Sequence, residues 1–275
     1  EGDDPDVASS LNNLASVRES LGRAGEAEPL YAEALAMYRR LFEGDHPDVA
    51  SSLNNLASVL EALGRVGEAE RLYEEALTMQ LRLFEGDHPH VAVSLNNLAG
   101  VRWALGRAGE AERLYEEALA MQRRLFEGDH PHVARSLNNI AFVRRALGRV
   151  SEAETLYAEA LAMRRRLFEG DHPDVASSLN NLADVREALG RAGEAEPLYV
   201  DALAMYRRLF EGDHPDVAMS LNNLAVFHGE QGRWKVALPL AEEALAMGGR
   251  CLPAGHPDLQ LWKANLALIR ERLDH

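Results

Sequence analysis

The sequence predicts an all-α protein, an α-solenoid of six helical hairpins followed by one capping helix. Two observations carry this prediction. The segment Glu-Gly-Asp-His-Pro recurs every 42 residues, and apolar residues within each repeat recur at helical spacing. A single hairpin cannot bury its own apolar side, so neighbouring hairpins must stack to form a core. We therefore expect 13 helices.

The repeat boundaries follow from the recurring segment, which opens the chain as Glu-Gly-Asp-Asp-Pro. Residues 1–42 and 169–210 differ at five positions, which indicates recent duplication or design. The sequence thus predicts a single domain, residues 1–275. Its repeats are 1–42, 43–84, 85–126, 127–168, 169–210 and 211–252, and its capping helix is 253–275.

Each repeat is predicted to hold two helices, as repeat 1 illustrates. Pro5 suits the first position of a helix, and Gly22 ends that helix. Gly25 allows a turn, so the second helix should begin near Glu26 and stop at a left-handed Gly44. The first helix should bury one apolar side, made of Val7, Leu11, Leu14 and Leu21. At the other end of the chain, the cap should cover repeat 6 with Trp262, Leu266 and Ile269.

Two stretches of the sequence carry a family resemblance. Residues 21–35 read Leu-Gly-Arg-Ala-Gly-Glu-Ala-Glu-Pro-Leu-Tyr-Ala-Glu-Ala-Leu and resemble the tetratricopeptide signature. The 42-residue period and His-Pro-Asp-Val-Ala-Ser-Ser-Leu-Asn-Asn-Leu-Ala at 46–57 resemble the repeats of kinesin light chain and its relatives. The resemblance implies a right-handed solenoid whose first helices line a concave groove. No heptad coiled coil is present, so motor attachment is not implied.

A comparison of the repeats with one another suggests where a ligand binds. Positions 9, 16, 19 and 38, counted from the first Glu of each repeat, change freely. Positions 9, 12, 16 and 19 fall within about 80° of one another on the first helix. Drift at a free surface would also explain the variation, and Trp103 could simply pack against its own hairpin. The residues predicted to bind an acidic or aromatic peptide segment at repeats 3–4 are Val93, Trp103, Arg135, Phe142, Arg145 and Arg164.

Position 12 is always asparagine, although asparagine is a mediocre helix former. One amide per repeat could hold the backbone of an extended ligand, because an amide both donates and accepts hydrogen bonds. Kinesin-light-chain-like repeats are similar in using the equivalent asparagine to contact the ligand backbone. A hydrogen bond between adjacent repeats, or copying in a young duplication, would explain the asparagines equally. The predicted ligand contacts are Asn12, Asn54, Asn96, Asn138, Asn180 and Asn222.

Composition narrows the classes of partner and compartment. The net charge of −15 disfavours nucleic acid, and no apolar run is long enough to cross a membrane. The single cysteine, Cys251, cannot form an internal disulfide, which favours the cytoplasm. The chain lacks an initiator methionine, so we expect it to be cut from a longer protein.

No motif predicts catalysis, a cofactor or a metal. His88-Pro89-His90 and His130-Pro131-His132 precede predicted helices and are interpreted as caps rather than metal ligands. The leading hypothesis is a non-enzymatic scaffold module that binds a protein or peptide. The alternatives are a self-stacking or consensus-like array without a ligand, and a regulatory segment of an enzyme. The oligomeric state stays open.

Overall fold

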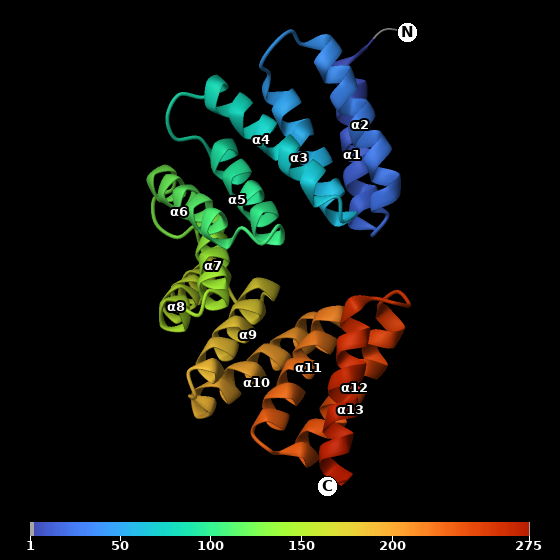
Figure 1. Ribbon diagram of the computed structural model, residues 1–275, viewed down its shortest axis with the longest axis vertical. Helices are drawn as coiled ribbons and strands as arrows, with labels where there is room; N and C mark the ends of the chain where they lie inside the picture. Colours follow the sequence, from blue (N-terminus) through green and yellow to red (C-terminus); the bar gives the residue numbers. More distant parts are fainter. Residues whose placement is uncertain (1–2, 275) are drawn as a thin grey trace. The chain divides into compact units, whose positions relative to one another are not determined.

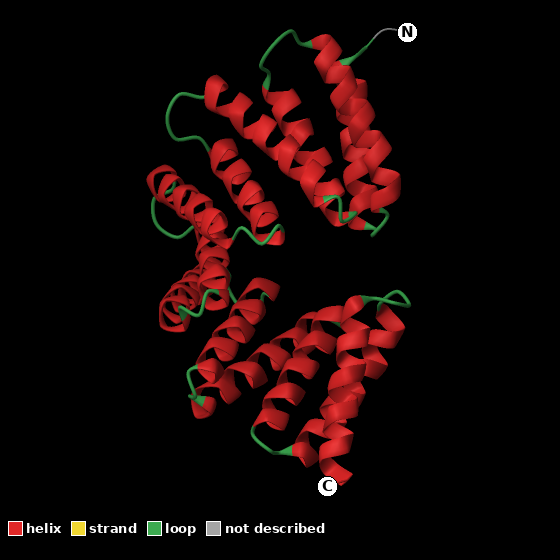
Figure 2. Ribbon diagram, viewed as in Figure 1, coloured by secondary structure: helices red, strands yellow, loops and turns green. Residues whose placement is uncertain are grey.

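The computed structural model describes residues 3–274, and over that range the chain forms 13 α-helices and no strand (Figure 1, Figure 2). The predicted all-α class and helix number are confirmed. The helices are α1 (Pro5–Ser20), α2 (Ala24–Leu41), α3 (Pro47–Ala62), α4 (Val66–Leu83), α5 (Pro89–Ala104), α6 (Ala108–Leu125), α7 (Pro131–Ala146), α8 (Val150–Leu167), α9 (Pro173–Ala188), α10 (Ala192–Leu209), α11 (Pro215–Glu230), α12 (Trp234–Cys251) and α13 (Pro257–Asp274).

The helices form two compact units, Glu1–Gly128 with α1–α6 and Asp129–His275 with α7–α13. Inside each unit, the second helix of one repeat packs on the first helix of the next, as α2 does on α3 and α10 on α11. First helices also contact one another: α1 with α3 and α3 with α5, and likewise α9 with α11 and α11 with α13. The first helices of each unit therefore share one face. That all repeats form one domain stays a prediction.

Histidines cap the first helices of repeats 2–6, as predicted, and Asp4 caps α1. The Nδ1 atom of His46 accepts a hydrogen bond of 3.2 Å from the backbone N–H of Asp48, and His88 accepts one of 3.2 Å from His90. The Phe42 ring stacks on His46 with 3.5 Å between ring centroids, which holds the imidazole in place. Proline follows at the first helical position, where its missing N–H costs nothing.

The helix ends follow the glycines with one correction. Gly22 and Gly44 have φ angles of 72° and 82°, the left-handed conformation that favours glycine. Gly25, by contrast, lies in the first turn of α2, which begins at Ala24. The predicted turn at Gly25 was wrong because Gly22 already reverses the chain, and the helix starts immediately after Arg23.

Small residues fill the contacts between helices. Ala8, Ala15, Ala27 and Ala34 are fully buried. In interior repeats the apolar side of the first helix is covered, so Val49 and Leu53 are 2% and 0% exposed. In repeat 1 the equivalent Val7 is 49% exposed, because no hairpin precedes α1 within the described residues. Leu21 is 63% exposed, and its inclusion in the buried side was wrong because it follows the last helical residue.

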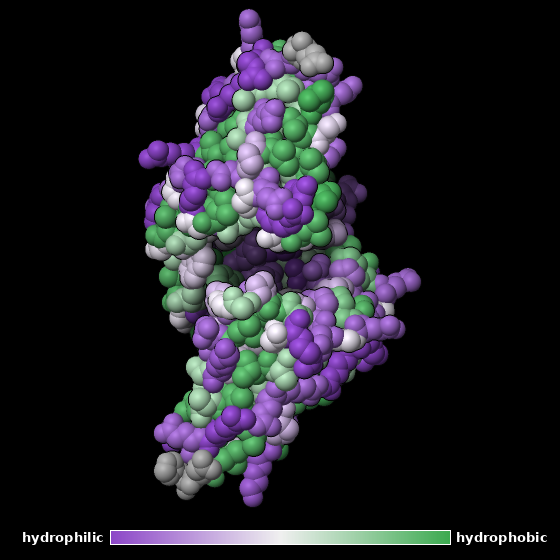
Figure 3. All heavy atoms as spheres, turned by 90° about the vertical axis from the view of Figure 1, so that its right-hand side faces the viewer, coloured by the Kyte–Doolittle hydropathy of each residue, from purple (hydrophilic) through white to green (hydrophobic). Residues whose placement is uncertain are grey.

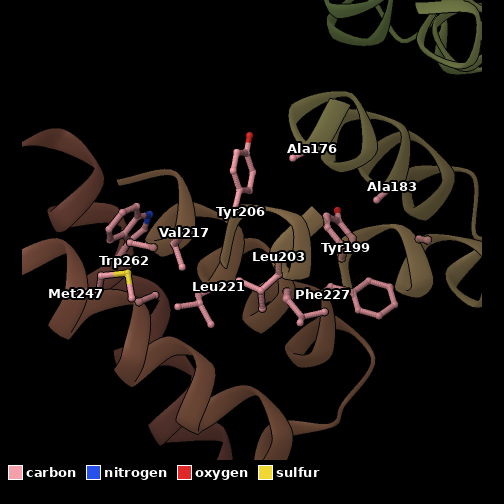
Figure 4. Close-up of a cluster of buried hydrophobic side chains, with 14 of the residues drawn as sticks. Ala176, Ala183, Tyr199, Leu203, Tyr206, Val217, Leu221, Phe227, Met247 and Trp262 are labelled. Carbon is pink, nitrogen blue, oxygen red and sulfur yellow. The ribbon is translucent and has the colours of Figure 1, made fainter. Parts of the chain in front are cut away.

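The predicted cap covers repeat 6. Trp262, Leu266 and Ile269 of α13 are at most 6% exposed. Trp262 joins Met247, Leu221 and Tyr206 in one hydrophobic cluster (Figure 4). Burial of these large side chains closes the apolar end of unit 2. No helix in residues 3–274 combines the length and apolar character needed to cross a membrane.

Candidate functional site

In unit 2 the first helices surround a cavity of about 420 Å³. Two predicted binding residues, Arg145 and Asn222, meet there. Two variable positions meet there as well, position 16 as Asp184 and Val226 and position 19 as Arg145 and Glu187. The remaining lining residues, none of which belongs to the predicted ligand-contact set, are Ala188, Tyr199, Asn223, Glu230, Leu261 and Asn265.

Tyr199 orients the carboxylates of the cavity. Its hydroxyl lies 2.5 Å from Asp184 Oδ1 and 3.0 Å from Glu187 Oε2. Because the hydroxyl carries one proton, it donates a hydrogen bond to one of these carboxylates at a time. The ring is 2% exposed and packs beside Phe227 (Figure 4), which fixes the hydroxyl toward α9. Asp184 is also paired with Arg145, whose Nη1 lies 3.1 Å from Asp184 Oδ2.

Glu187 has an unusual electrostatic setting. Burial raises its pKa to about 7, and the nearby charges of Glu230 and Asp184 add to the rise. Its Oε1 atom is buried and has no hydrogen-bond partner among the described residues. Burial raises the pKa of Tyr199, and the carboxylates of Asp184 and Glu187 add to that rise. At neutral pH the site therefore holds a carboxyl group balanced between its two protonation states.

Repeat 1 shows how the same carboxylate is satisfied elsewhere. Glu19 occupies the position of Glu187, and Tyr31 donates to its Oε2 at 3.0 Å. Ser58 of the next repeat donates to Glu19 Oε1 at 3.1 Å. In unit 2 the residue equivalent to Ser58 is Val226, which cannot donate. A single change at position 16 thus leaves Glu187 with an unpaired oxygen.

The position-12 asparagines make hydrogen bonds inside the fold. Asn12 donates to Ser52 Oγ at 3.1 Å, and Asn54 donates to Ser94 Oγ at 2.8 Å. In unit 2 the direction reverses, since Asn138 accepts from Asn181 at 2.8 Å and Asn222 from Asn265 at 3.0 Å. Bonds between repeats are thus one reason for asparagine at this position, and ligand contact stays a prediction.

Three members of the series are almost entirely buried: Asn96, Asn180 and Asn222 are at most 6% exposed. Asn96 donates to Ala92 O within its own helix at 2.8 Å. The Oδ1 atom of Asn180 has no partner in the described part of the chain. Asn222 is the member that lines the cavity.

The residues predicted to form a patch at repeats 3–4 are divided between the units. Val93 and Trp103 are half-buried on α5 of unit 1. Arg135 and Phe142 are exposed on α7 of unit 2, where Phe142 is 44% exposed. Their use by a ligand stays a prediction.

Arg164 lies between helices rather than at the surface. It is 8% exposed, and its Nη1 donates to Asp174 O at 3.0 Å and to Ser178 Oγ at 2.6 Å. Other residues at position 38 are equally buried, with Gln80 at 1% and Tyr206 at 2% exposure. Variation at position 38 therefore changes the packing between repeats, which a comparison of repeats cannot distinguish from variation at a surface. A ligand contact by Arg164 stays a prediction.

Comparisons with known proteins agree with this architecture. The tetratricopeptide repeat family profile matches residues 6–82, 50–124, 90–166, 132–208 and 174–248. A kinesin light chain-like protein of Podosopora anserina with nearly identical TPR-like repeats is 27% identical, with a TM-score of 0.63, over 76% of this chain and 99% of that one. No curated protein matches the sequence.

Two further solved structures share the fold at lower identity. BtubC (BKLC) from P. vanneervenii is 23% identical, with a TM-score of 0.66, over 91% of this chain and 94% of that one. A chain of the APC/C hetero-tetramer Cut9–Hcn1 is 16% identical, with a TM-score of 0.68, over 96% of this chain and 43% of that one. With its repeats matched from residue 6 to residue 248, the chain belongs to the tetratricopeptide repeat family.

Proposed function

We propose that this chain is a non-catalytic, cytoplasmic module that binds a segment of another polypeptide along the first helices of its repeats. Tetratricopeptide repeats commonly mediate protein–protein interaction, and the family match supports that class of function. The observation that carries the proposal is the cavity on the first-helix face of unit 2. There Asn222 meets the variable residues at positions 16 and 19, one of which is Arg145.

The chemistry of the face suits a peptide. Asn222 offers an amide to a ligand backbone, and Val226 and Leu261 offer apolar surface. Exposed Phe142 and Arg135 on α7 would suit an aromatic or acidic side chain of the same ligand. Variation at these positions between repeats would then give each repeat its own preference.

A peptide-array binding assay with the full chain tests the proposal. Val226→Arg places a long side chain in the cavity, and we expect peptides captured by the native chain to lose at least about tenfold in affinity. Val200→Arg makes the same change at a site on α10 that is 47% exposed, and it should bind as the native chain does. Equal capture by all three proteins would remove this face from the proposal.

A second candidate function, self-association, rests on a different observation. Repeat 1 exposes an apolar face on α1, with Val7, Leu14 and Val17 between 46% and 54% exposed. Val59, the residue of repeat 2 that is equivalent to Val17, is fully buried. We propose that a second copy of this chain covers the apolar face of α1 with the same face of its own.

A further inference from the structure

We infer that the cavity of unit 2 binds the positively charged side chain of a basic residue, arginine or lysine, in a bound peptide. This inference deepens the proposed peptide-binding function and rests on it. The carboxylates of the cavity lie on α9 and α11, outside repeats 3–4, where an acidic or aromatic segment is predicted, while Arg145 of its lining belongs to repeat 4.

The first step is the charge of the cavity. Its charged lining residues are Asp184, Glu187, Glu230 and Arg145. Arg145 is committed to Asp184 at 3.1 Å. Neither Glu187 nor Glu230 forms an ion pair with a basic side chain within the described residues. Two carboxylates are thus left without a counter-charge in one concave site.

The second step is their mutual position. The charge of Glu230 and a side-chain contact with it both raise the pKa of Glu187, so the two carboxyl groups lie close together and favour a state in which one of them keeps a proton. The Oε1 atom of Glu187 is buried without a hydrogen-bond donor, while its Oε2 atom lies 3.0 Å from the Tyr199 hydroxyl. An unpaired buried acceptor is costly, and a charged N–H donor is the group that relieves it best.

The third step is independent of the acids. Asn222 is 5% exposed and lines the cavity, and its Oδ1 accepts from Asn265 at 3.0 Å. Its amide nitrogen donates no hydrogen bond to a described residue. A peptide residue carries an acceptor, its backbone carbonyl, close to its side chain. A basic residue in a peptide therefore supplies both groups that the cavity lacks, a cation for Glu187 and Glu230 and a carbonyl for Asn222.

A metal ion is a poorer match. No group of three or more histidine, cysteine, aspartate or glutamate side chains is placed to hold a metal among the described residues. Part of the lining is apolar, with Val226 and Leu261 on α11 and α13. Such walls suit the aliphatic stem of an arginine or lysine better than a hydrated ion.

The inference predicts a characteristic pH dependence. Groups facing Glu187 are Tyr199 of α10, Asp184 of α9, Glu230 of α11 and Arg145 of α7, and α13 adds only uncharged lining. Because burial and these carboxylates place the pKa of Glu187 near 7, a bound cation should displace its proton. Affinity for basic peptides should fall as the pH is lowered from 8 to 6, and binding near pH 7 should release protons.

The test uses the full chain and end-capped pentapeptides with alanine at four positions. The central residue is arginine, lysine, norleucine or glutamate. Titration calorimetry in two buffers of different ionisation enthalpy measures affinity and proton release together. We expect the arginine and lysine peptides to bind at least about tenfold more tightly than the other two, and Glu187→Gln and Glu230→Gln each to abolish most of that preference.

Matched controls separate the possible outcomes. Glu271→Gln removes one exposed carboxylate of α13 outside the cavity and should leave binding unchanged. Binding of all four peptides with equal affinity, or an unchanged preference in both variants, overturns the cation site and leaves the peptide-binding proposal standing. Failure of any peptide on the array to depend on Val226 would overturn the peptide-binding proposal itself. Tighter binding of Ca²⁺ than of the arginine peptide would also count against the inference.

Discussion

At the scale of single residues, comparing repeats predicts the site only in part. Asp184 and Glu187, which line the cavity, occupy the variable positions 16 and 19, although neither is among the predicted ligand contacts. Tyr199 escaped notice because five repeats share a tyrosine at position 31, and a constant residue reads as core. Glu230 could have been found, since position 20 is serine or alanine in every other repeat. The proximity of Glu230 to Glu187 could not have been predicted from the sequence, because it depends on how α9 packs against α11.

The raised pKa of Glu187 leads to a prediction about stability. A carboxyl group whose folded pKa exceeds its unfolded value of 4.5 stabilises the fold at low pH and loses that contribution as the pH rises through about 7. Glu187→Gln keeps an acceptor for Tyr199 but removes the charge. We expect it to raise the free energy of unfolding by about 1 kcal/mol at pH 8, after allowance for solvent screening.

Urea titrations at pH 8 and pH 5 check this prediction. At pH 5 the native carboxyl group is largely protonated, so the advantage of glutamine should vanish. An equal gain at both values would show that the charge of Glu187 is not its cause. If Glu187→Gln is more stable than the native chain at pH 8 and also loses cation binding, the native chain keeps a destabilising glutamate because ligand binding requires it.

At the scale of elements, local signals predicted helix starts and stops well, and neighbouring elements explain the exceptions. The first helices of repeats 2–6 start at a histidine followed by a proline, so the repeat itself contains this start signal. The second helices start without a side-chain cap, as α2 does after Arg23. Gly248 in α12 was interpreted as free variation at position 38. The structure gives it a packing role, since an added Cβ would lie 2.3 Å from Cζ3 of Trp262. The cause lies in α13, outside the repeat pattern.

Two adjacent glycines of α12 allow a matched test of this packing. Gly248→Ala should lower the free energy of unfolding of unit 2 by about 1–3 kcal/mol, because Trp262 must move from its buried position. Gly249→Ala meets nothing within 4 Å and should gain up to about 1 kcal/mol from helix propensity alone. Chemical denaturation followed by tryptophan fluorescence measures both. Similar effects of the two substitutions would contradict a steric role for Gly248.

At the scale of the whole molecule, the 42-residue period predicted the number of helices and their class. It did not predict the division into two units at Gly128 and Asp129. Repeats 3 and 4 carry the same helix signals and the same linking segment as the others, so nothing local marks that boundary. The face of Figure 3 shows hydrophilic residues interspersed with exposed hydrophobic ones. A periodic pattern assigns core positions to every repeat alike, including positions that are exposed in repeat 1, such as Leu14 and Val17.

The exposed apolar face of α1 leads to a prediction about self-association. In interior repeats the residues equivalent to Leu14 and Val17 are covered, and Leu98 and Val101 are at most 2% exposed. If two chains bury their α1 faces against each other, sedimentation should show a concentration-dependent dimer. Replacing Leu14 and Val17 together by glutamate should raise the dissociation constant at least about tenfold, because charges would then face an apolar contact.

The control for that measurement is Leu81→Glu, which places a charge on the exposed side of α4, where Leu81 is 56% exposed. It should leave the dimer intact, and circular dichroism should confirm that all the proteins keep their helices. A native chain that sediments as a monomer at every concentration would rule out stacking through α1. The apolar face would then be a surface that this chain tolerates in water, and peptide binding would stand as the single proposed function.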